Sequence, residues 1–179
     1  MKIGVSSLKT GFSDELEFDF QEKWSYLGTA SAKLPVVAPV RVQGKVTNTG
    51  KSMLVEGKVV TALQLTCDRC LAAYKFPLKV YLQEEYVVNS DPAQAGSRDE
   101  LEAENLRLYK GEIIDLQPAV EEALTIALPM KSLCHEDCRG LCPRCGQNFN
   151  EAQCQCETET VDPRLAVLGK LLSPKEGES

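Results

Sequence analysis

The sequence contains almost no histidine and few aromatic residues. His135 is its single histidine, and aromatic residues make up 6% of the 179 residues. A Gly-rich phosphate loop, a nucleophile elbow and an HExxH motif are also missing. Histidine-based acid–base catalysis therefore has one candidate residue, with no obvious partner nearby in the sequence. We expect a protein that is not an enzyme and has no small-molecule substrate.

Long hydrophobic runs are missing as well. There is no apolar stretch of about 18 residues that could cross a membrane. Lys2, Lys9 and Asp14 interrupt the N-terminal region, where a signal peptide would be apolar. We therefore expect a cytoplasmic protein without a membrane partner. Because glutathione keeps cytoplasmic thiols reduced, clustered cysteines in such a protein indicate metal binding rather than disulfides.

The charge of the chain is negative overall and unevenly distributed. The formal net charge is −6, which argues against indiscriminate coating of nucleic acid. Residues 33–79 nevertheless have a net charge of +6, and residues 84–122 have a net charge of −8. This asymmetry fits a protein that meets RNA or another charged partner with one face. The alternative is that the basic and acidic segments pair with each other within the fold.

Cysteine is the residue type that the sequence has in a distinctive pattern. Six of the eight cysteines fall between residues 134 and 156, in CHEDCRGLCPRCGQNFNEAQCQC, and the motif CDRC at 67–70 holds the other two. A CxxC turn brings two thiolates to one side of the backbone, and four thiolates satisfy a tetrahedral zinc ion. Gly146 permits the left-handed conformation that such a turn needs. The expected metal ligands are Cys67, Cys70, Cys134, Cys138, Cys142, Cys145, Cys154 and Cys156.

Spacing alone leaves open how these cysteines divide into sites. The CPRCG and CQC motifs supply the nearest closed set of four thiolates. Pairing the CDRC motif with Cys134 and Cys138 would make a second set, so that the cofactor would be one or two zinc ions. In a competing division, Cys138 or His135 joins the C-terminal set and other thiols stay free. Two filled four-thiolate sites would change the formal charge from −6 to −10.

Alternating hydrophobicity predicts an antiparallel sheet. Apolar residues recur at every second position in residues 15–20, 40–46, 53–65 and 74–88, and Asn48-Thr49-Gly50 supplies a turn. The CDRC motif falls in the turn between the last two of these strands. We predict an α+β fold: an antiparallel sheet or partly open barrel, with a helix and a C-terminal cysteine-rich zinc-binding module.

The expected domain organisation follows these patterns. Residues 1–90 form the β-rich domain with the CDRC knuckle, and residues 91–112 form an acidic linker or loop. Residues 113–172 contain a helix, the zinc-binding module and a short C-terminal helix that starts at Asp162. Asp115 is the expected N-cap of the first helix, and Pro129 ends it. Residues 173–179 are the expected tail.

One surface of the predicted sheet should be basic. Several lysines fall on the strand positions that alternate with the apolar residues, so that they face away from the core. The candidate residues for binding nucleic acid or a protein partner are Lys45, Lys58, Arg69, Lys75 and Lys79.

The chain resembles the YceD family over nearly its whole length. The resemblance is carried by VSSLK near the N-terminus, LTCDRCL, IDLQPAVEEALTIALPMK, CRGLCPRCGQNFN, CQC and DPRLAVLGKL. It implies a bacterial, cytosolic, non-enzymatic protein that is needed for accumulation of large-subunit ribosomal RNA. The expected function is therefore that of a ribosome-biogenesis factor that binds ribosomal RNA, a large-subunit ribosomal protein or an assembly intermediate.

A different function class fits the same cysteines. Zinc held by CxxC and CxC motifs also occurs in thiol switches and in redox-regulated chaperones, where oxidation releases the ion and unfolds a segment. Arg139 and Arg144 could lower the pKa of neighbouring thiols. The alternative function is thus a zinc-thiolate redox switch or a redox-regulated, chaperone-like protein.

Overall fold

The computed structural model describes residues 1–9, 14–28, 33–88 and 106–156. The chain divides into two compact units: unit 1 is Met1–Thr66 with Ala73–Ser132, and unit 2 is Cys67–Ala72 with Leu133–Ser179. Among the described residues, no helix has the length and apolarity needed to cross a bilayer. Residues 91–105 of the expected linker, the expected helix from Asp162 and the tail at 173–179 lie outside the described residues.

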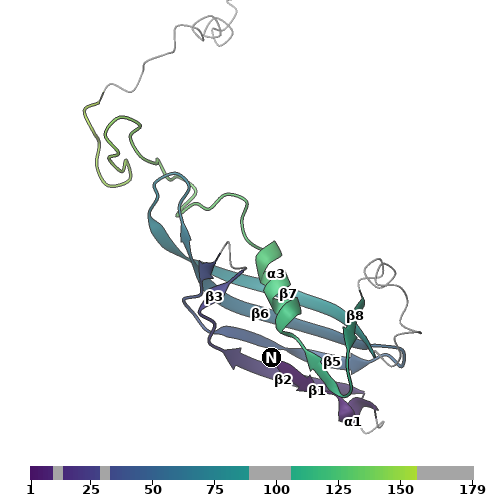
Figure 1. Ribbon diagram of the computed structural model, residues 1–179. Coiled ribbons are helices and arrows are strands. Elements are labelled where there is room, and N and C mark those ends of the chain that lie inside the picture. Colours follow the sequence, from purple (N-terminus) through teal and green to yellow (C-terminus); the bar gives the residue numbers. More distant parts are fainter. Residues whose placement is uncertain (10–13, 29–32, 89–105, 157–179) are drawn as a thin grey trace, which may run out of the picture. The chain divides into compact units, whose positions relative to one another are not determined.

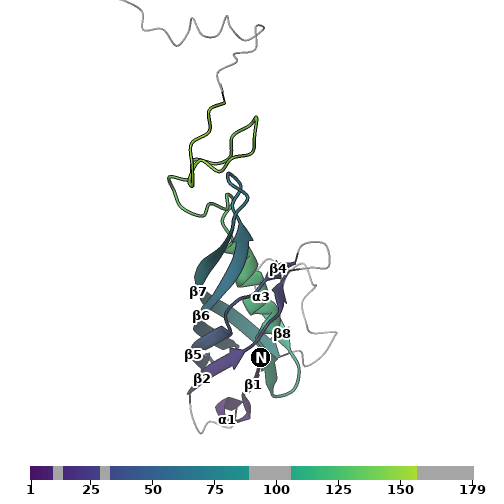
Figure 2. The ribbon, with the colours of Figure 1, turned by 90° about the vertical axis from the view of Figure 1, so that its left-hand side faces the viewer.

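Unit 1 is built on a five-stranded sheet with the strand order β2-β5-β6-β7-β8 (Figure 1). Its first four strands are antiparallel neighbours, and β8 runs parallel to β7. The expected β-rich, mainly antiparallel fold is confirmed, and the described strands form an open sheet (Figure 2). The strands are β2 (Glu15–Glu22), β5 (Val40–Asn48), β6 (Met53–Thr66), β7 (Ala73–Val88) and β8 (Leu106–Tyr109).

The alternation in the sequence determines which face of this sheet is buried. Val42, Val46, Val55 and Val59 have no exposed surface, whereas the residues between them on β5 and β6 are partly or fully exposed. Successive strand residues point to opposite faces, so all four valines lie on the inner face. The predicted turn joins these two strands, and the backbone N–H of Gly50 donates to the Asn48 side chain at 2.9 Å.

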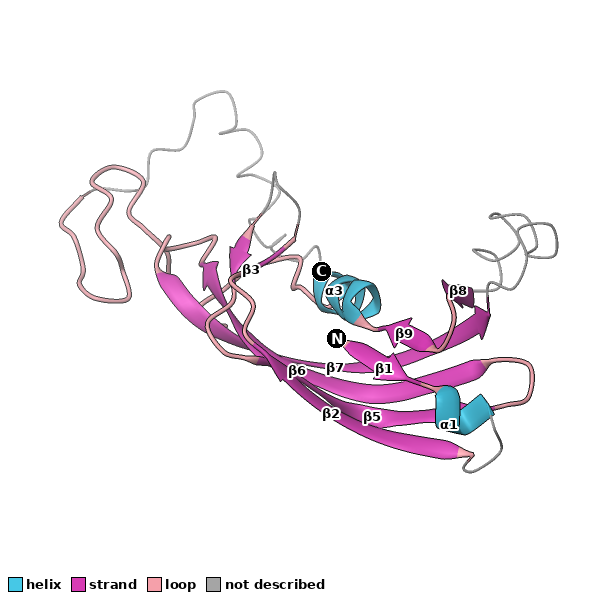
Figure 3. Cartoon of the chain, turned by 60° about the horizontal axis from the view of Figure 1, so that its bottom comes forward, coloured by secondary structure: helices cyan, strands magenta, loops and turns pink. Residues whose placement is uncertain are grey.

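Short elements cover the inner face of the sheet (Figure 3). Strand β1 (Lys2–Gly4) pairs with β9 (Ile113–Asp115), and helix α3 (Gln117–Ile126) follows β9 directly. Their buried side chains join those of the sheet in one hydrophobic core. The other elements among the described residues of unit 1 are α1 (Ser6–Lys9), β3 (Tyr26–Leu27) and β4 (Leu34–Pro35).

The helix expected after Asp115 begins at Gln117, and a strand precedes it. Residues 113–115 form β9, because their backbone pairs with β1 and Ile114 enters the core with no exposed surface. The N-cap of α3 is Leu116, without a side-chain cap, so the expectation that Asp115 is the N-cap is wrong by one residue. The Asp115 carboxylate still accepts a hydrogen bond of 3.0 Å from the backbone N–H of Gln117. The strand at 113–115 therefore depends on pairing with β1, which is distant in sequence and which the local pattern does not predict.

The end of the predicted linker at 91–112 is also a strand. Residues 106–109 form β8 alongside the end of β7, and Tyr109 is buried. Arg107 donates to Glu84 at 2.7 Å and also bonds Glu122 of α3, and these bonds raise the pKa of Arg107 further. Helix α3 belongs to unit 1, whereas the sequence pattern grouped residues 113–132 with the cysteine segment.

The backbones of β5 and β6 lie so close together at Gly44 that a side chain added there should destabilise the sheet. A Cβ atom at Gly44 would lie 2.0 Å from the backbone oxygen of Glu56, so the two strands would have to separate. We expect Gly44→Ala to lower the free energy of unfolding by about 3 kcal/mol, as measured by urea denaturation. Gly4→Ala is the matched control, because a Cβ there has no neighbour within 4 Å. Equal stability of the two variants would contradict the register described for these strands.

Candidate metal centres

Unit 2 brings four sulfur atoms together in a first cluster, site A. Its residues are Cys67, Cys70, Cys134 and Cys138, and their sulfur atoms all lie within 4.8 Å of one another. The Sγ atoms of Cys67 and Cys138 are 3.7 Å apart, as are those of Cys70 and Cys134. All but Cys134 are buried. Site A therefore joins residues that are 64 to 71 positions apart in the chain.

The remaining four cysteines form a second cluster of the same size, site B. Its residues are Cys142, Cys145, Cys154 and Cys156, again with all sulfur atoms within 4.8 Å of one another. Site B is less enclosed than site A, since Cys142 is buried but Cys145 is exposed. Sites A and B therefore match one of the predicted divisions: the CDRC motif with Cys134 and Cys138 in one set, and the CPRCG and CQC motifs in the other. His135 belongs to neither set.

The sulfur geometry fits a tetrahedral metal ion. Zinc–thiolate bonds of about 2.3 Å at tetrahedral angles require sulfur atoms about 3.8 Å apart. The two sulfur–sulfur distances of 3.7 Å in site A agree with this spacing. Both clusters could therefore hold metal ions. Four thiolates would fill every position around a tetrahedral zinc ion, which is the arrangement of a structural site.

The two CxxC turns share one backbone design. In site A the N–H of Leu71 donates to the Cys67 carbonyl at 2.9 Å, and in site B the N–H of Gly146 donates to the Cys142 carbonyl at 2.9 Å. The residue after the second cysteine is left-handed in both, with φ of 58° at Leu71 and 74° at Gly146. The prediction of a left-handed Gly146 is confirmed. The left-handed conformation of Leu71 is not predictable from the sequence, because leucine rarely adopts it.

The first cysteine of each CxxC turn lies where its thiolate is stabilised. Burial raises the pKa of Cys67, but backbone N–H groups of Cys70, Cys134 and Arg69 outweigh burial and lower this pKa to about 6. The N–H groups of Cys145 and Arg144 lower the pKa of Cys142 to about 6. A metal binds the thiolate rather than the thiol. Burial raises the pKa of Cys138 in site A as well, but the Asn150 side chain and the backbone N–H of Gly140 outweigh burial and lower this pKa, so each cluster contains at least one sulfur favoured as a thiolate.

Two polar residues support site A, and the cysteine pattern did not reveal either role. The side-chain amide of Asn150 donates to Cys138 Sγ at 3.3 Å, and its oxygen accepts from the backbone N–H of Arg139 at 2.9 Å. The Arg69 guanidinium donates to the carbonyls of Cys138 and Glu136, at 2.8 and 3.3 Å. Arg69, predicted to bind RNA or a partner, is therefore engaged with the backbone of unit 2.

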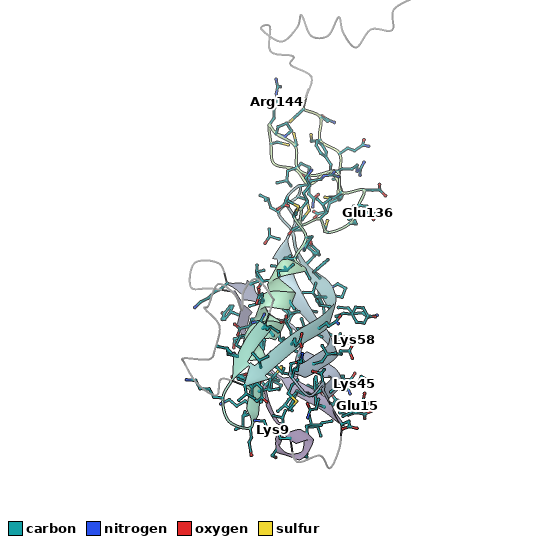
Figure 4. All side chains as sticks on the ribbon, turned by 90° about the vertical axis from the view of Figure 1, so that its right-hand side faces the viewer. Lys9, Glu15, Lys45, Lys58, Glu136 and Arg144 are labelled. Atoms are coloured by element: carbon teal, nitrogen blue, oxygen red, sulfur yellow. The ribbon has the colours of Figure 1, made fainter. Side chains whose placement is uncertain are left out.

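The other predicted binding residues lie on the outer face of the sheet in unit 1. Lys45 is paired with Glu15 at 2.8 Å, and the two residues project from the same side of the sheet as Lys58 (Figure 4). This pairing raises the pKa of Lys45. Within the described parts of the chain, no ion pair is found for Lys58, Lys75 or Lys79. Among the described residues, the outer face thus has lysines without an ion pair on the part of β6 and β7 between Lys58 and Lys75, whereas Glu56 and Glu85 lie further along the same face and the charges toward β2 are paired.

Comparison with known protein families identifies the family to which this chain belongs. The family described as "Large ribosomal RNA subunit accumulation protein YceD" matches residues 55–172, a range that contains all eight cysteines. The chain belongs to the YceD family. The resemblance found in the sequence motifs is therefore confirmed. No solved structure matches the chain.

Relatives of this YceD chain occur in bacteria and in a plant. The Bacillus subtilis protein named "Uncharacterized protein YlbN" is 25% identical, over 96% of both chains. A Mycobacterium tuberculosis protein is 28% identical over 73% of this chain and 61% of its own length. An Arabidopsis thaliana protein, "Large ribosomal RNA subunit accumulation protein YCED homolog 1, chloroplastic", is 25% identical over 98% of this chain and 62% of its own length.

The division into sites A and B makes a prediction about zinc stoichiometry. We expect the purified YceD chain to hold two zinc ions. In the presence of a competing chelator, the variants Cys138→Ser and Cys142→Ser should each hold one. Structural zinc can contribute about 10–16 kcal/mol to folding, so each loss should destabilise unit 2 by several kcal/mol. Elemental analysis gives the stoichiometry, and thermal unfolding gives the stability.

His135→Ala is the matched control for these variants. Because His135 lies outside both sulfur clusters, this variant should keep two ions. A loss of one ion from His135→Ala, or two ions retained by Cys142→Ser, would contradict the division into two four-thiolate sites.

Proposed function

We propose that this YceD chain is a non-enzymatic, cytoplasmic ribosome-biogenesis factor that supports accumulation of large-subunit ribosomal RNA. Two structural zinc ions hold unit 2 together through sites A and B. The chain acts by binding ribosomal RNA or an assembly intermediate that contains it. Membership in a family described by large-subunit ribosomal RNA accumulation is the observation that carries this proposal.

The chemistry of the chain supports this assignment. Each cluster offers four thiolates and no further ligand, so a bound ion would have no open position for a substrate. The cytoplasm keeps thiols reduced, as zinc–thiolate sites require. Lys58, Lys75 and Lys79 on β6 and β7 offer positive charge to a polyanion such as ribosomal RNA.

The proposal is tested by deleting the gene for this chain and restoring it in variant forms. We expect deletion to lower the ratio of large-subunit to small-subunit ribosomal RNA, and the wild-type gene to restore it. The double variant Lys58→Glu and Lys75→Glu should fail to restore the ratio and should sediment less with large-subunit precursors. Its melting temperature should change little, because exposed substitutions shift stability by about 0.5 kcal/mol or less.

The double variant Lys23→Glu and Lys110→Glu is the control for the change in net charge. Both lysines are exposed, and neither lies on the outer strand positions of β6 and β7. This variant should restore the ribosomal RNA ratio. An unchanged ratio in the deletion strain would refute the proposed function.

A redox switch is the second candidate function, and the exposure of site B favours it. Cys145 is exposed, so peroxide can reach a sulfur atom of this cluster directly. Peroxide would oxidise two thiolates to a disulfide, be reduced to water, and release the ion. The switch predicts that mild peroxide releases one zinc ion within minutes and exposes apolar surface. A structural role predicts that both ions and all eight thiols are retained.

A further inference from the structure

The most exposed aromatic residue of the outer sheet face is Tyr81. It lies on β7, and 74% of its surface is exposed. Its cross-strand partner on β6 is Lys58, and the ammonium group of Lys79 lies 5.6 Å from the centre of its ring. An aromatic side chain flanked by two lysines is thus presented to solvent on a regular strand, where the backbone fixes its direction.

The residues around Tyr81 extend this arrangement. Val60 is paired with Lys79 across the strands and is 41% exposed, so it adds apolar surface beside the ring. Further along the same face, Lys75 is paired with Gln64. We call this surface the tyrosine platform, and its residues are Lys58, Val60, Lys75, Lys79 and Tyr81.

The platform is the part of the outer face where lysines outnumber carboxylates. From Lys58 to Gln64 on β6, and from Lys75 to Tyr81 on β7, no outward position is a carboxylate, and the next outward residue on β6 before Lys58 is Glu56, which lies opposite Lys45. On β2 and β5, by contrast, Asp19 bonds Arg41 at 2.7 Å and Glu15 bonds Lys45 at 2.8 Å. A polyanion would therefore find unpaired lysines beside Tyr81 and compensated charges elsewhere on this face.

We propose that the tyrosine platform binds single-stranded RNA, with one base stacked on Tyr81 and neighbouring phosphates on Lys58 and Lys79. This inference rests on the proposed function and names the form of RNA that the chain contacts. The bases of a duplex are already stacked on one another, whereas an unpaired base can lie on an exposed aromatic ring. The Lys79 ammonium lies over one face of that ring, so a base stacks there only when the flexible lysine side chain moves from the ring to the neighbouring phosphate.

A second tyrosine–lysine pair in unit 1 provides a matched control. Tyr26 on β3 is 56% exposed, and the Lys33 ammonium lies 5.9 Å from its ring centre. The residue paired with Tyr26 across the strands is Pro35, so this pair lacks the second lysine. Tyr26 tests whether any exposed ring beside a lysine is sufficient for binding.

The experiment measures binding of the full zinc-loaded chain to a fluorescein-labelled single-stranded RNA of twelve adenosines by fluorescence anisotropy. We expect Tyr81→Ala to weaken binding by about 5-fold or more, the range found when one stacked aromatic is removed. Tyr81→Phe keeps the ring and should stay within about 2-fold of wild type, as should Tyr26→Ala. The same RNA annealed to a complementary strand should bind more weakly than the single strand.

Salt dependence separates stacking from phosphate contact. Each phosphate contact to a single strand contributes about 0.7 to the slope of log Kd against log salt. Lys58→Ala and Lys79→Ala should each lower the slope by that amount, whereas Tyr81→Ala should leave it unchanged. Lys45→Ala should also leave it unchanged, because Lys45 is paired with Glu15.

Failure of this inference can be told apart from failure of the proposed function. The platform is refuted as an RNA site if wild type prefers the duplex, or if Tyr26→Ala weakens binding as much as Tyr81→Ala. It is refuted too if the chain binds no RNA while Tyr81→Ala still fails to restore ribosomal RNA in cells, which would indicate a protein partner. Tyr81-dependent RNA binding together with normal ribosomal RNA in the deletion strain would instead refute the proposed function alone.

Discussion

The pairing register between β6 and β7 is the constraint on which the arrangement of side chains in unit 1 depends. It runs without interruption from Met53 opposite Tyr86 to Thr66 opposite Ala73. A shift by one residue would turn the buried face of one strand toward solvent, so burial of the valines and leucines fixes it. The same register sets Lys58 opposite Tyr81 and ends where the first CxxC turn begins.

Much of this sheet could be predicted from sequence, because a period of two is a local pattern. The β5, β6 and β7 strands, the turn at Asn48 and the outward direction of Lys75 and Lys79 all follow from alternation. Pairing partners do not follow from it. The ion pair of Lys45 with Glu15 depends on which strand lies beside β5, and β9 depends on β1, which is more than a hundred residues earlier. These contacts join residues far apart in the chain, and such contacts do not produce a periodic pattern in the sequence.

The candidate metal centres were predictable in a different way. Counting showed that eight thiols suffice for two four-thiolate sites, but spacing could not exclude a site containing His135. Only the positions of the sulfur atoms separate the alternatives. The hydrogen bonds that Asn150 and Arg69 make to site A could not be predicted from the sequence, because neither residue type is a ligand in a zinc–thiolate site. The ligand atoms were thus foreseeable from chemistry, and their surroundings were not.

The left-handed leucine of site A has a consequence for how unit 2 acquires its shape. Gly146, at the equivalent position in the turn of site B, adopts the left-handed conformation at little cost. For a residue with a side chain, such as Leu71, this conformation costs roughly 1–2 kcal/mol of conformational free energy. Leu71 is also 65% exposed, so burial of its side chain does little to offset that cost. The cost is offset by backbone hydrogen bonds within the turn: the Cys67 N–H donates to the Ala72 carbonyl and the Leu71 N–H donates to the Cys67 carbonyl, each at 2.9 Å. The loop therefore holds Cys67 and Cys70 in place through its own backbone, and it can form before an ion reaches the sulfur atoms.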